Sequence, residues 1–329
     1  MNFSLARFDA WNLLLGALLV VILSYGYIAV PSFFTSFNLS QVAASAAEKS
    51  LLVLPMVLLI IAREIDLSVA SILALASVCF GLLVQSQVPM PLAIMLTLLA
   101  GAVLGGFNGW LVAFVGLPSL LVTLGTLAMY RGFGYILLGN ASVNKFSPAF
   151  LALGNDNIPG TAIPWIIVPF LMLAPVFILA LQFTPFGKRI YAAGGNPDAA
   201  RYSGILVDRL RFGLFVISGL MCSLAGIVYT ARLSNARANN ALGMELDVIT
   251  IALLGGVSVF GGKGKMTGVI LALLLIIVLR NLLGLNQIGG DAQGTLIGLL
   301  LIVTLLISNS TGFLINRLQI ASQLNKARG

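Results

Sequence analysis

Residues 67–130 contain no charged side chain, and this run of 64 residues is the feature that most constrains the fold. A helix needs about 20 apolar residues to cross the hydrocarbon core of a bilayer, so the run can hold two full spans and most of a third. The rest of the chain agrees, because 59% of its 329 residues are hydrophobic and only 9% are charged. A soluble domain usually carries about 25% charged residues. We therefore expect an all-α polytopic membrane protein.

Apolar runs along the chain predict about ten transmembrane helices, which together form one domain over residues 1–329. The expected spans are 11–30, 43–62, 69–86, 91–113, 119–138, 164–183, 212–230, 247–260, 266–285 and 294–310. The run at 247–260 is short for a span, so it either crosses the membrane or enters it and returns. The first run is about 20 residues long and lacks a small-residue cleavage site, so we expect it to remain in the mature chain.

The distribution of basic residues predicts the orientation, because cytoplasmic loops are enriched in Lys and Arg. With ten spans both termini share a side. Cytoplasmic termini place twelve basic residues inside: Arg7, Arg63, Lys188, Arg189, Arg201, Arg209, Arg211, Lys263, Lys265, Arg317, Lys326 and Arg328. The outside loops then hold only Lys145, Arg232 and Arg237, while Lys49, Arg131 and Arg280 fall within spans or near their ends.

Several functions are disfavoured by missing residues. The chain has no histidine, which argues against Ser-His-Asp hydrolases and His-ligated metals. Its two cysteines cannot supply an all-cysteine metal site. The glycines of 255–264 do not form a nucleotide-binding loop, because Val257 stands where a loop glycine is needed and Gly264 stands where Ser or Thr would hold magnesium. We expect no cofactor in this chain and no nucleic-acid binding.

The most basic inside loop, residues 184–211, is expected to contain a short helix. Asn196 can cap a helix that begins at Pro197, Asp198 suits its first turn, and Gly204 can end it. Its exposed face is expected to carry Ala199, Ala200 and Tyr202. From the residues alone, this segment is either a docking helix for a partner or a surface turn.

Polar residues within or beside apolar spans are candidates for a translocation path: Asp66, Ser68, Asn108, Thr123, Thr126 and Arg131. Asp66 and Asp247 begin similar short segments in the two halves, a pattern that can mark a transport site. Acids that cap helix starts are the alternative. The threonine hydroxyls have the alternative of bonding to their own helix. Asn108 lies beside Gly101, Gly105 and Gly109, whose four-residue spacing predicts close helix packing.

Four ordered blocks resemble the permease subunits of ribose-type carbohydrate ABC importers, which include those for ribose, xylose, galactosides, rhamnose and autoinducer-2. The blocks are IDLSVAS at 65–71, PSLLVTLGT at 118–126 with Arg131-Gly132, GGNP at 194–197 continuing to 203–205, and GMELD at 243–247 followed by the glycines of 255–264. They spread over most of the chain, so the match is specific.

The resemblance implies a transport subunit of the bacterial inner membrane, not an enzyme. Its expected partners are a cytoplasmic ATP-binding subunit that hydrolyses ATP, a periplasmic substrate-binding protein, a second identical or similar permease subunit, and membrane lipid. It implies that the ATP-binding subunit contacts Gly195, Asn196, Pro197, Ala199, Ala200, Arg201 and Ser203. It also makes Arg232 and Glu245 expected contacts of the substrate-binding protein.

The chain departs from the family pattern at Arg63-Glu64, where Gly-Gly or Ser-Gly is usual before Ile-Asp-Leu-Ser, and at Ala70, which replaces a glycine. If this segment lies near the path, the added charge and bulk reflect a particular sugar, and we lean toward rhamnose or another deoxyhexose or pentose. A local variation at the cytoplasmic edge is the alternative. An ABC permease for autoinducer-2, a nucleoside or a branched-chain amino acid is the alternative. An ion-coupled secondary carrier that uses Asp66 is a second alternative.

Overall fold

The computed structural model describes residues 3–290, 292–299 and 302 of the chain. Within these residues the structure is helical, and the only β-bridges are two isolated ones, Val143 with Ala236 and Asn157 with Pro164. Seven of the described helices are long and apolar enough to cross a membrane. The prediction of an all-α polytopic membrane protein is therefore confirmed.

The first nine expected spans each contain a helix. The order is α1 Phe3–Ala29, α2 Ser36–Ile61, α3 Val69–Gln85, α4 Met90–Ala113, α5 Ser119–Leu138, α6 Pro148–Asn155, the 3₁₀ turn η1 Trp165–Ile167, α7 Val168–Phe183, α8 Pro185–Gly195, α9 Pro197–Tyr202, α10 Val207–Leu233, α11 Met244–Leu254 and α12 Met266–Leu285. The expected span at 294–310 lies largely outside the described residues.

One expected span is shorter than the sequence suggested. The helix in the 247–260 region, α11, has 11 residues and ends at Leu254. Gly255 caps it, and Gly256 follows with a φ of 84°, a left-handed conformation that a helix cannot continue. Residues 255–265 are a loop that connects α11 to α12.

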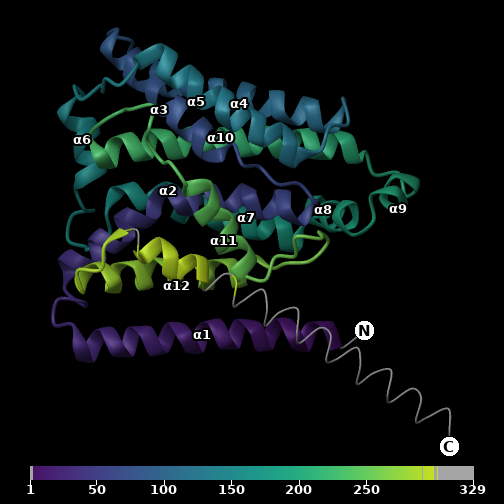
Figure 1. Cartoon of the computed structure of the whole chain (residues 1–329), viewed down its shortest axis with the longest axis horizontal. Helices are drawn as coiled ribbons and strands as arrows, with labels where there is room; N and C mark the ends of the chain where they lie inside the picture. The colour runs from purple at the N-terminus through teal and green to yellow at the C-terminus, as the bar shows by residue number, and fades with distance from the viewer. Residues whose placement is uncertain (1–2, 291, 300–301, 303–329) are drawn as a thin grey trace, which may run out of the picture.

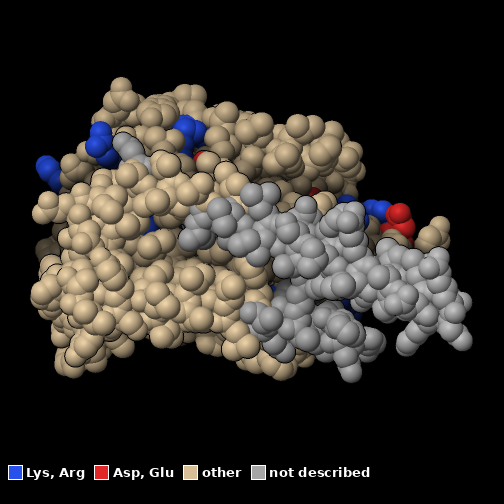
Figure 2. Space-filling model, turned by 60° about the horizontal axis from the view of Figure 1, so that its bottom comes forward, with Lys and Arg blue, Asp and Glu red and all other residues tan. Residues whose placement is uncertain are grey.

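The long helices run side by side along the longest axis of the molecule, with α6 at one end and α8 and α9 at the other (Figure 1). Below, these are the α6 end and the α9 end. Figure 2 shows a broad face that is nearly free of charge, with most of the visible charged residues gathered toward the ends. A lipid-facing surface is expected to look like this, because a charge in hydrocarbon is costly.

The central helix is α2, of whose most apolar stretch 89% is buried, against 11% for α1 and 22% for α4. It packs against α10, α11, α12 and α7. A helix that is apolar on all sides is typically found at the centre of a bundle, because each of its faces can pack against another helix. The α2 helix therefore forms the centre of the bundle.

Close packing joins α4 to α10, as the glycine spacing predicted. Any side chain at Gly105 would collide with the carbonyl oxygen of Phe215, and one at Gly219 would collide with that of Gly101. Small residues let two backbones approach in this way, so that van der Waals contact replaces the missing hydrophobic driving force between membrane helices.

Candidate functional site

The α9 helix begins at the α9 end of the molecule as the sequence predicted. Asn196 has an extended backbone, and its Oδ1 accepts hydrogen bonds from the amides of Asp198 and Ala199, each at 3.1 Å. Pro197 occupies the first helical position, where its missing amide hydrogen costs nothing. The helix ends at Tyr202, and Gly204 follows with a φ of 83°.

One face of α9 is open to solvent. Ala199 is exposed and Tyr202 is 93% exposed, so both are available to a partner. The expectation that Ala200 shares this face is wrong, because Ala200 is only 4% exposed and packs with Ala193 and Val207. Successive helical residues point about 100° apart, so Ala200 faces the start of α10 when Ala199 faces outward.

The other residues of this loop hold α9 in place. Arg201 forms ion pairs with Asp208 at 2.7 Å and with Asp198 at 3.6 Å. The hydrogen bond from Arg201 to Asp208 raises the pKa of the guanidinium further above its usual range. The Ser203 hydroxyl donates to the carbonyl of Ala199, while Gly195 is exposed beside the cap.

The α8 helix rests on the end of α2. Gly194 approaches the carbonyl oxygen of Ile61 so closely that any side chain would collide with it. The Tyr191 hydroxyl donates to the carbonyl of Gly264 at 2.7 Å, and burial raises the pKa of Tyr191, which keeps it protonated as a donor. A force on α9 would therefore reach the central helix through α8.

Four of the six path candidates lie around the α2–α3 linker, residues 62–68, in a buried polar chain. The Tyr130 hydroxyl lies 3.0 Å from Asn108 Oδ1, and Asn108 Nδ2 donates to the Ser68 hydroxyl at 2.8 Å. Ser68 donates to Asp66 Oδ1 at 2.6 Å, and Ser218 donates to Asp66 Oδ2 at 2.9 Å. Thr123 joins the group through the carbonyl of Ile65. Asp66, Ser68, Asn108 and Ser218 are fully buried.

The threonines of α5 fasten the same linker. The Thr123 hydroxyl lies 3.1 Å from the carbonyl oxygen of Ile65 and 2.8 Å from that of Ser119. The amide of Ile65 in turn donates to the Ser119 hydroxyl at 3.2 Å. Thr126 is buried too, and its hydroxyl points to the Thr123 carbonyl at 3.4 Å. Both threonines therefore bond within their own helix, and Thr123 also reaches the linker.

Arg131 lies apart from the other path candidates. Its Nη1 donates to the carbonyls of Ala238 and Asn240 at 2.8 and 2.6 Å. These residues belong to the segment between α10 and α11, so Arg131 holds that segment against α5. Its role in a path stays a prediction.

The departure at Arg63-Glu64 produces two contacts at the α9 end. Arg63 has a φ of 68° and donates from Nε to the Phe260 carbonyl at 2.6 Å. Glu64 pairs with Arg211 at 2.8 Å. Burial raises the pKa of Glu64, and the charge of Arg211 opposes this effect. The two residues and Arg211 line a cavity of about 520 Å³ that also reaches Arg201 and Asp208.

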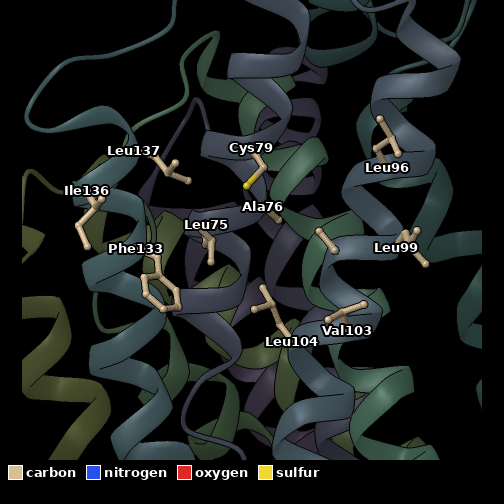
Figure 3. Close-up of a pocket in the computed structure, with 11 residues that line it drawn as sticks. Leu75, Ala76, Cys79, Leu96, Leu99, Val103, Leu104, Phe133, Ile136 and Leu137 are labelled. Atoms are coloured by element: carbon tan, nitrogen blue, oxygen red, sulfur yellow. The ribbon is translucent and has the colours of Figure 1, made fainter.

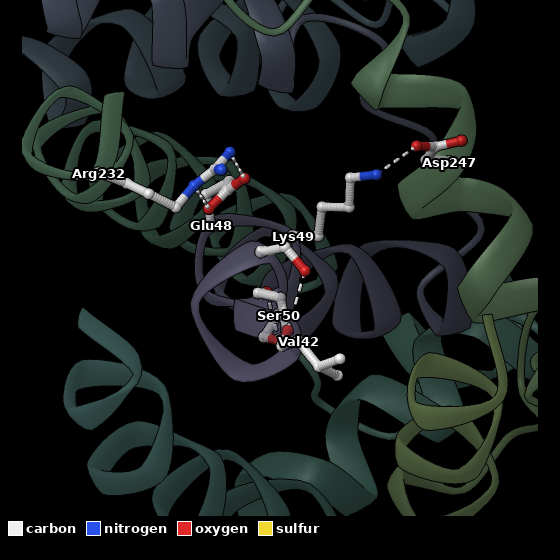
Figure 4. Close-up of polar contacts among 8 residues, drawn as sticks. Val42, Glu48, Lys49, Ser50, Arg232 and Asp247 are labelled. Carbon is white, nitrogen blue, oxygen red and sulfur yellow. Dashed lines mark hydrogen bonds and ion pairs between the residues drawn. The ribbon is translucent and has the colours of Figure 1, made fainter. Parts of the chain in front are cut away.

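Charged pairs between α2 and the helices around it were not predicted from the sequence. Arg232 donates to both oxygens of Glu48, at 2.7 and 3.2 Å, and Glu48 is only 1% exposed. Lys49 and Arg280 both pair with Asp247, at 2.8 and 2.7 Å. Figure 4 shows that Glu48 and Lys49, neighbours on α2, point to different helices. The signal in the sequence was the presence of charged residues inside apolar runs, because such residues need a partner of opposite charge.

This arrangement bears on the expected contacts of a substrate-binding protein. Arg232 uses its guanidinium on Glu48, although its side chain is still 25% exposed. Glu245 lies half-buried in the first turn of α11. Arg232 lies near the α6 end, in the last turn of α10, and whether either residue contacts a partner stays a prediction.

A second cavity, of about 500 Å³, opens between α3, α4 and α5 and is lined by apolar side chains such as Leu75, Val103 and Phe133, together with Cys79 (Figure 3). Its apolar lining offers little to the hydroxyl groups of a sugar. Among the described residues no group of three or more His, Cys, Asp or Glu could hold a metal ion.

Comparison with known proteins identifies relatives along nearly the whole chain. A family model described as the permease component of the branched-chain amino acid transport system matches residues 38–305. The ribose import permease protein RbsC of Haemophilus influenzae is 32% identical over 315 residues, which cover 94% of this chain and 97% of that protein. The autoinducer 2 import system permease protein LsrD of Escherichia coli O157:H7 is 33% identical over 303 residues, which cover 89% of this chain and 90% of that protein. No solved structure matches the chain.

Proposed function

The chain belongs to the family of branched-chain amino acid transport system permease components, and we propose that it is the membrane-spanning subunit of an ABC importer for a monosaccharide. The observation that carries the proposal is α9, a capped helix that exposes Ala199 and Tyr202 at one end of an apolar helical bundle. A transport subunit that is driven by a separate ATPase needs such an exposed, firmly attached element.

We propose ten spans with both termini in the cytoplasm of a bacterium, in its inner membrane. The α9 end is then cytoplasmic and the α6 end periplasmic. The excess of basic residues in the loops at the α9 end supports this orientation. The segment between α10 and α11, together with the short helix α11, makes the eighth crossing in this arrangement, and the loop at 255–265 lies at its cytoplasmic end.

The proposed partners follow from the two ends. A cytoplasmic ATP-binding subunit hydrolyses ATP and docks on α9, at Gly195, Asn196, Pro197, Ala199, Arg201 and Ser203, with the buried Ala200 supporting the helix from beneath. A periplasmic substrate-binding protein docks at the α6 end near Arg232 and Glu245. A second permease subunit completes the pathway.

ATP-driven closure of the partner moves α9 and α8, and α8 moves the end of α2 on which Gly194 rests. A rigid helix that changes its packing as a unit is a common switching element. We propose that Asp66, Ser68, Asn108, Thr123 and Thr126 act on the path by fixing the α2–α3 linker, whose position then sets the width of the inner end.

The substrate is proposed to be a neutral polyhydroxylated molecule, because the relatives are named for import of ribose and autoinducer 2. Ribose is the first candidate. Rhamnose or another deoxyhexose stays a candidate on the strength of Arg63-Glu64, and autoinducer-2, a nucleoside or a branched-chain amino acid is the alternative.

Uptake into liposomes tests this function. The chain is reconstituted with its ATP-binding subunit and its substrate-binding protein, and labelled ribose, rhamnose and leucine are offered in turn. The proposal expects ATP-dependent accumulation of a sugar. Accumulation driven by an ion gradient in the absence of the ATP-binding subunit would contradict it and favour a secondary carrier.

A further inference from the structure

A tight turn at residues 258–261 presents an exposed aromatic side chain at the α9 end. The Gly261 amide donates to the Ser258 carbonyl at 2.9 Å, which places Val259 and Phe260 at the tip of the turn. The Ser258 amide donates to the Lys263 carbonyl at 3.0 Å and closes the loop behind them. Phe260 is 83% exposed and Val259 is 43% exposed. Val259 and Phe260 together form a small apolar patch at the tip of the turn, and contiguous exposed apolar patches mark interaction sites.

The turn is firmly held by three elements of the bundle. The Gly262 amide donates to the Ile61 carbonyl at the end of α2 at 2.8 Å. Arg63 Nε donates to the Phe260 carbonyl at 2.6 Å, and Tyr191 of α8 donates to the Gly264 carbonyl at 2.7 Å. Phe260 is therefore carried on a fixed platform.

The same turn packs against the residues that lead into α9. Gly262 has a φ of 68°, and a side chain there would approach the Cα of Gly195 to 2.7 Å. A side chain at Gly261 would come equally close to the carbonyl oxygen of Gly194. The glycines in this loop therefore allow two backbones to meet directly beside Asn196. Figure 1 shows the α11–α12 connection reaching α8.

We propose that residues 258–264 are a second docking element for the ATP-binding subunit, in which Phe260 enters an apolar recess of that subunit. This rests on the proposed function and extends the docking surface beyond α9. The turn adjoins the α9 segment through Gly194 and Gly195, and that segment carries the exposed Tyr202 and Leu206. Arg63 and Lys263 are exposed at its edge, so the recess is expected to have an acidic rim.

The attachment of the turn gives this second contact a mechanical consequence. A movement of the ATP-binding subunit reaches α2 through Gly262 and reaches α11 and α12 through the loop itself. With α9 alone, the same movement would reach the bundle only through α8 and α10. Two contacts resist rotation of the partner where a single helix would act as a pivot.

Phe260→Ala tests the proposal, with Phe183→Ala as the matched control. Phe183 is the last residue of α7, it is 71% exposed, and it lies at the same end but outside the turn. Each variant is purified in detergent, and its affinity for the purified ATP-binding subunit is measured by surface plasmon resonance. The proposal expects Phe260→Ala to weaken binding about tenfold or more and Phe183→Ala to change it less than twofold. Phe260→Leu is expected to restore most of the affinity.

Wild-type affinity of Phe260→Ala would overturn the proposal. So would a variant that binds the ATP-binding subunit normally but retains less anionic lipid than the wild-type chain when purified in detergent, which would assign Phe260 to the lipid headgroups. Unchanged melting temperatures of the variants show that the fold is intact. Failure of the wild-type chain to bind any ATP-binding subunit would contradict the proposed function itself, which makes the two failures distinguishable.

Discussion

Ser68 donates its hydroxyl to the carboxylate of Asp66 at 2.6 Å, and both residues are fully buried. Ser218, on α10, donates to the other carboxylate oxygen at 2.9 Å. The α2–α3 linker is thereby tied to a helix 152 positions further along the chain. A buried carboxylate is tolerated only where donors replace the water that it has lost.

Ser218→Ala is expected to destabilise the protein by about 1–3 kcal/mol, because it leaves one oxygen of a buried carboxylate without its donor. Thermal unfolding in detergent measures the effect. Ser45→Ala is the control, because the Ser45 hydroxyl is exposed and bonds only to its own helix. Equal melting temperatures for the two variants would show that the Ser218 hydrogen bond contributes nothing.

Glu48 and Arg232 are expected to behave as a coupled pair. Removing one partner of a buried ion pair costs about 3–5 kcal/mol, because the remaining charge is left uncompensated. Glu48→Gln and Arg232→Gln are therefore each strongly destabilising, while the double variant loses much less than their sum. The exposed pair Arg201–Asp208 should give a coupling below about 1 kcal/mol in the same double-mutant cycle. Additive effects at Glu48 and Arg232 would refute the coupling.

Gly194→Ala and Gly195→Ala are neighbouring substitutions with opposite expected results. A methyl group at Gly194 collides with the Ile61 carbonyl, whereas one at Gly195 has open space around it. Overpacking typically costs about 1–3 kcal/mol, so Gly194→Ala should lower the melting temperature while Gly195→Ala leaves it unchanged. Equal behaviour of the two variants would show that α8 does not rest on α2.

Glu64 predicts a dependence of stability on pH. Because burial raises its pKa above the ordinary 4.5, the folded state holds this proton more tightly than the unfolded state does. The stability that this contributes is fully present below pH 4.5 and is lost as the pH rises through the raised pKa. Relative to Glu64→Gln, the wild-type melting temperature should therefore fall over that window. A relative rise would mean that Arg211 outweighs burial.

The positions of the long helices along the chain could largely be predicted from the sequence, because apolar runs and their lengths are local properties. The cap at Asn196 and the packing of Gly105 were predictable for the same reason. The burial of Ala200 could not be predicted. In a helix of only six residues, which side is buried depends on the neighbouring elements that pack against it, and the local sequence does not show these.

Pairings between distant residues could not be predicted either. Glu48 and Arg232 are 184 positions apart, and Lys49 and Asp247 are 198 apart. A single sequence shows that such charges lie in apolar runs, which indicates that each needs a partner, but not which partner the fold brings to it. The same holds for Asp66 and Ser218.

The central claim is that an ATP-binding subunit drives sugar import through α9, and Ala199→Asp tests it most directly. Ala199 is exposed, so the substitution puts a charge into the proposed interface without disturbing the buried Ala200. The measurement is ATP-driven uptake of ribose by liposomes that contain the chain, the ATP-binding subunit and the substrate-binding protein. We predict that the variant melts at the wild-type temperature and loses at least 90% of the uptake, about the tenfold effect of one disrupted interface hot spot. Uptake at the wild-type rate would contradict the account.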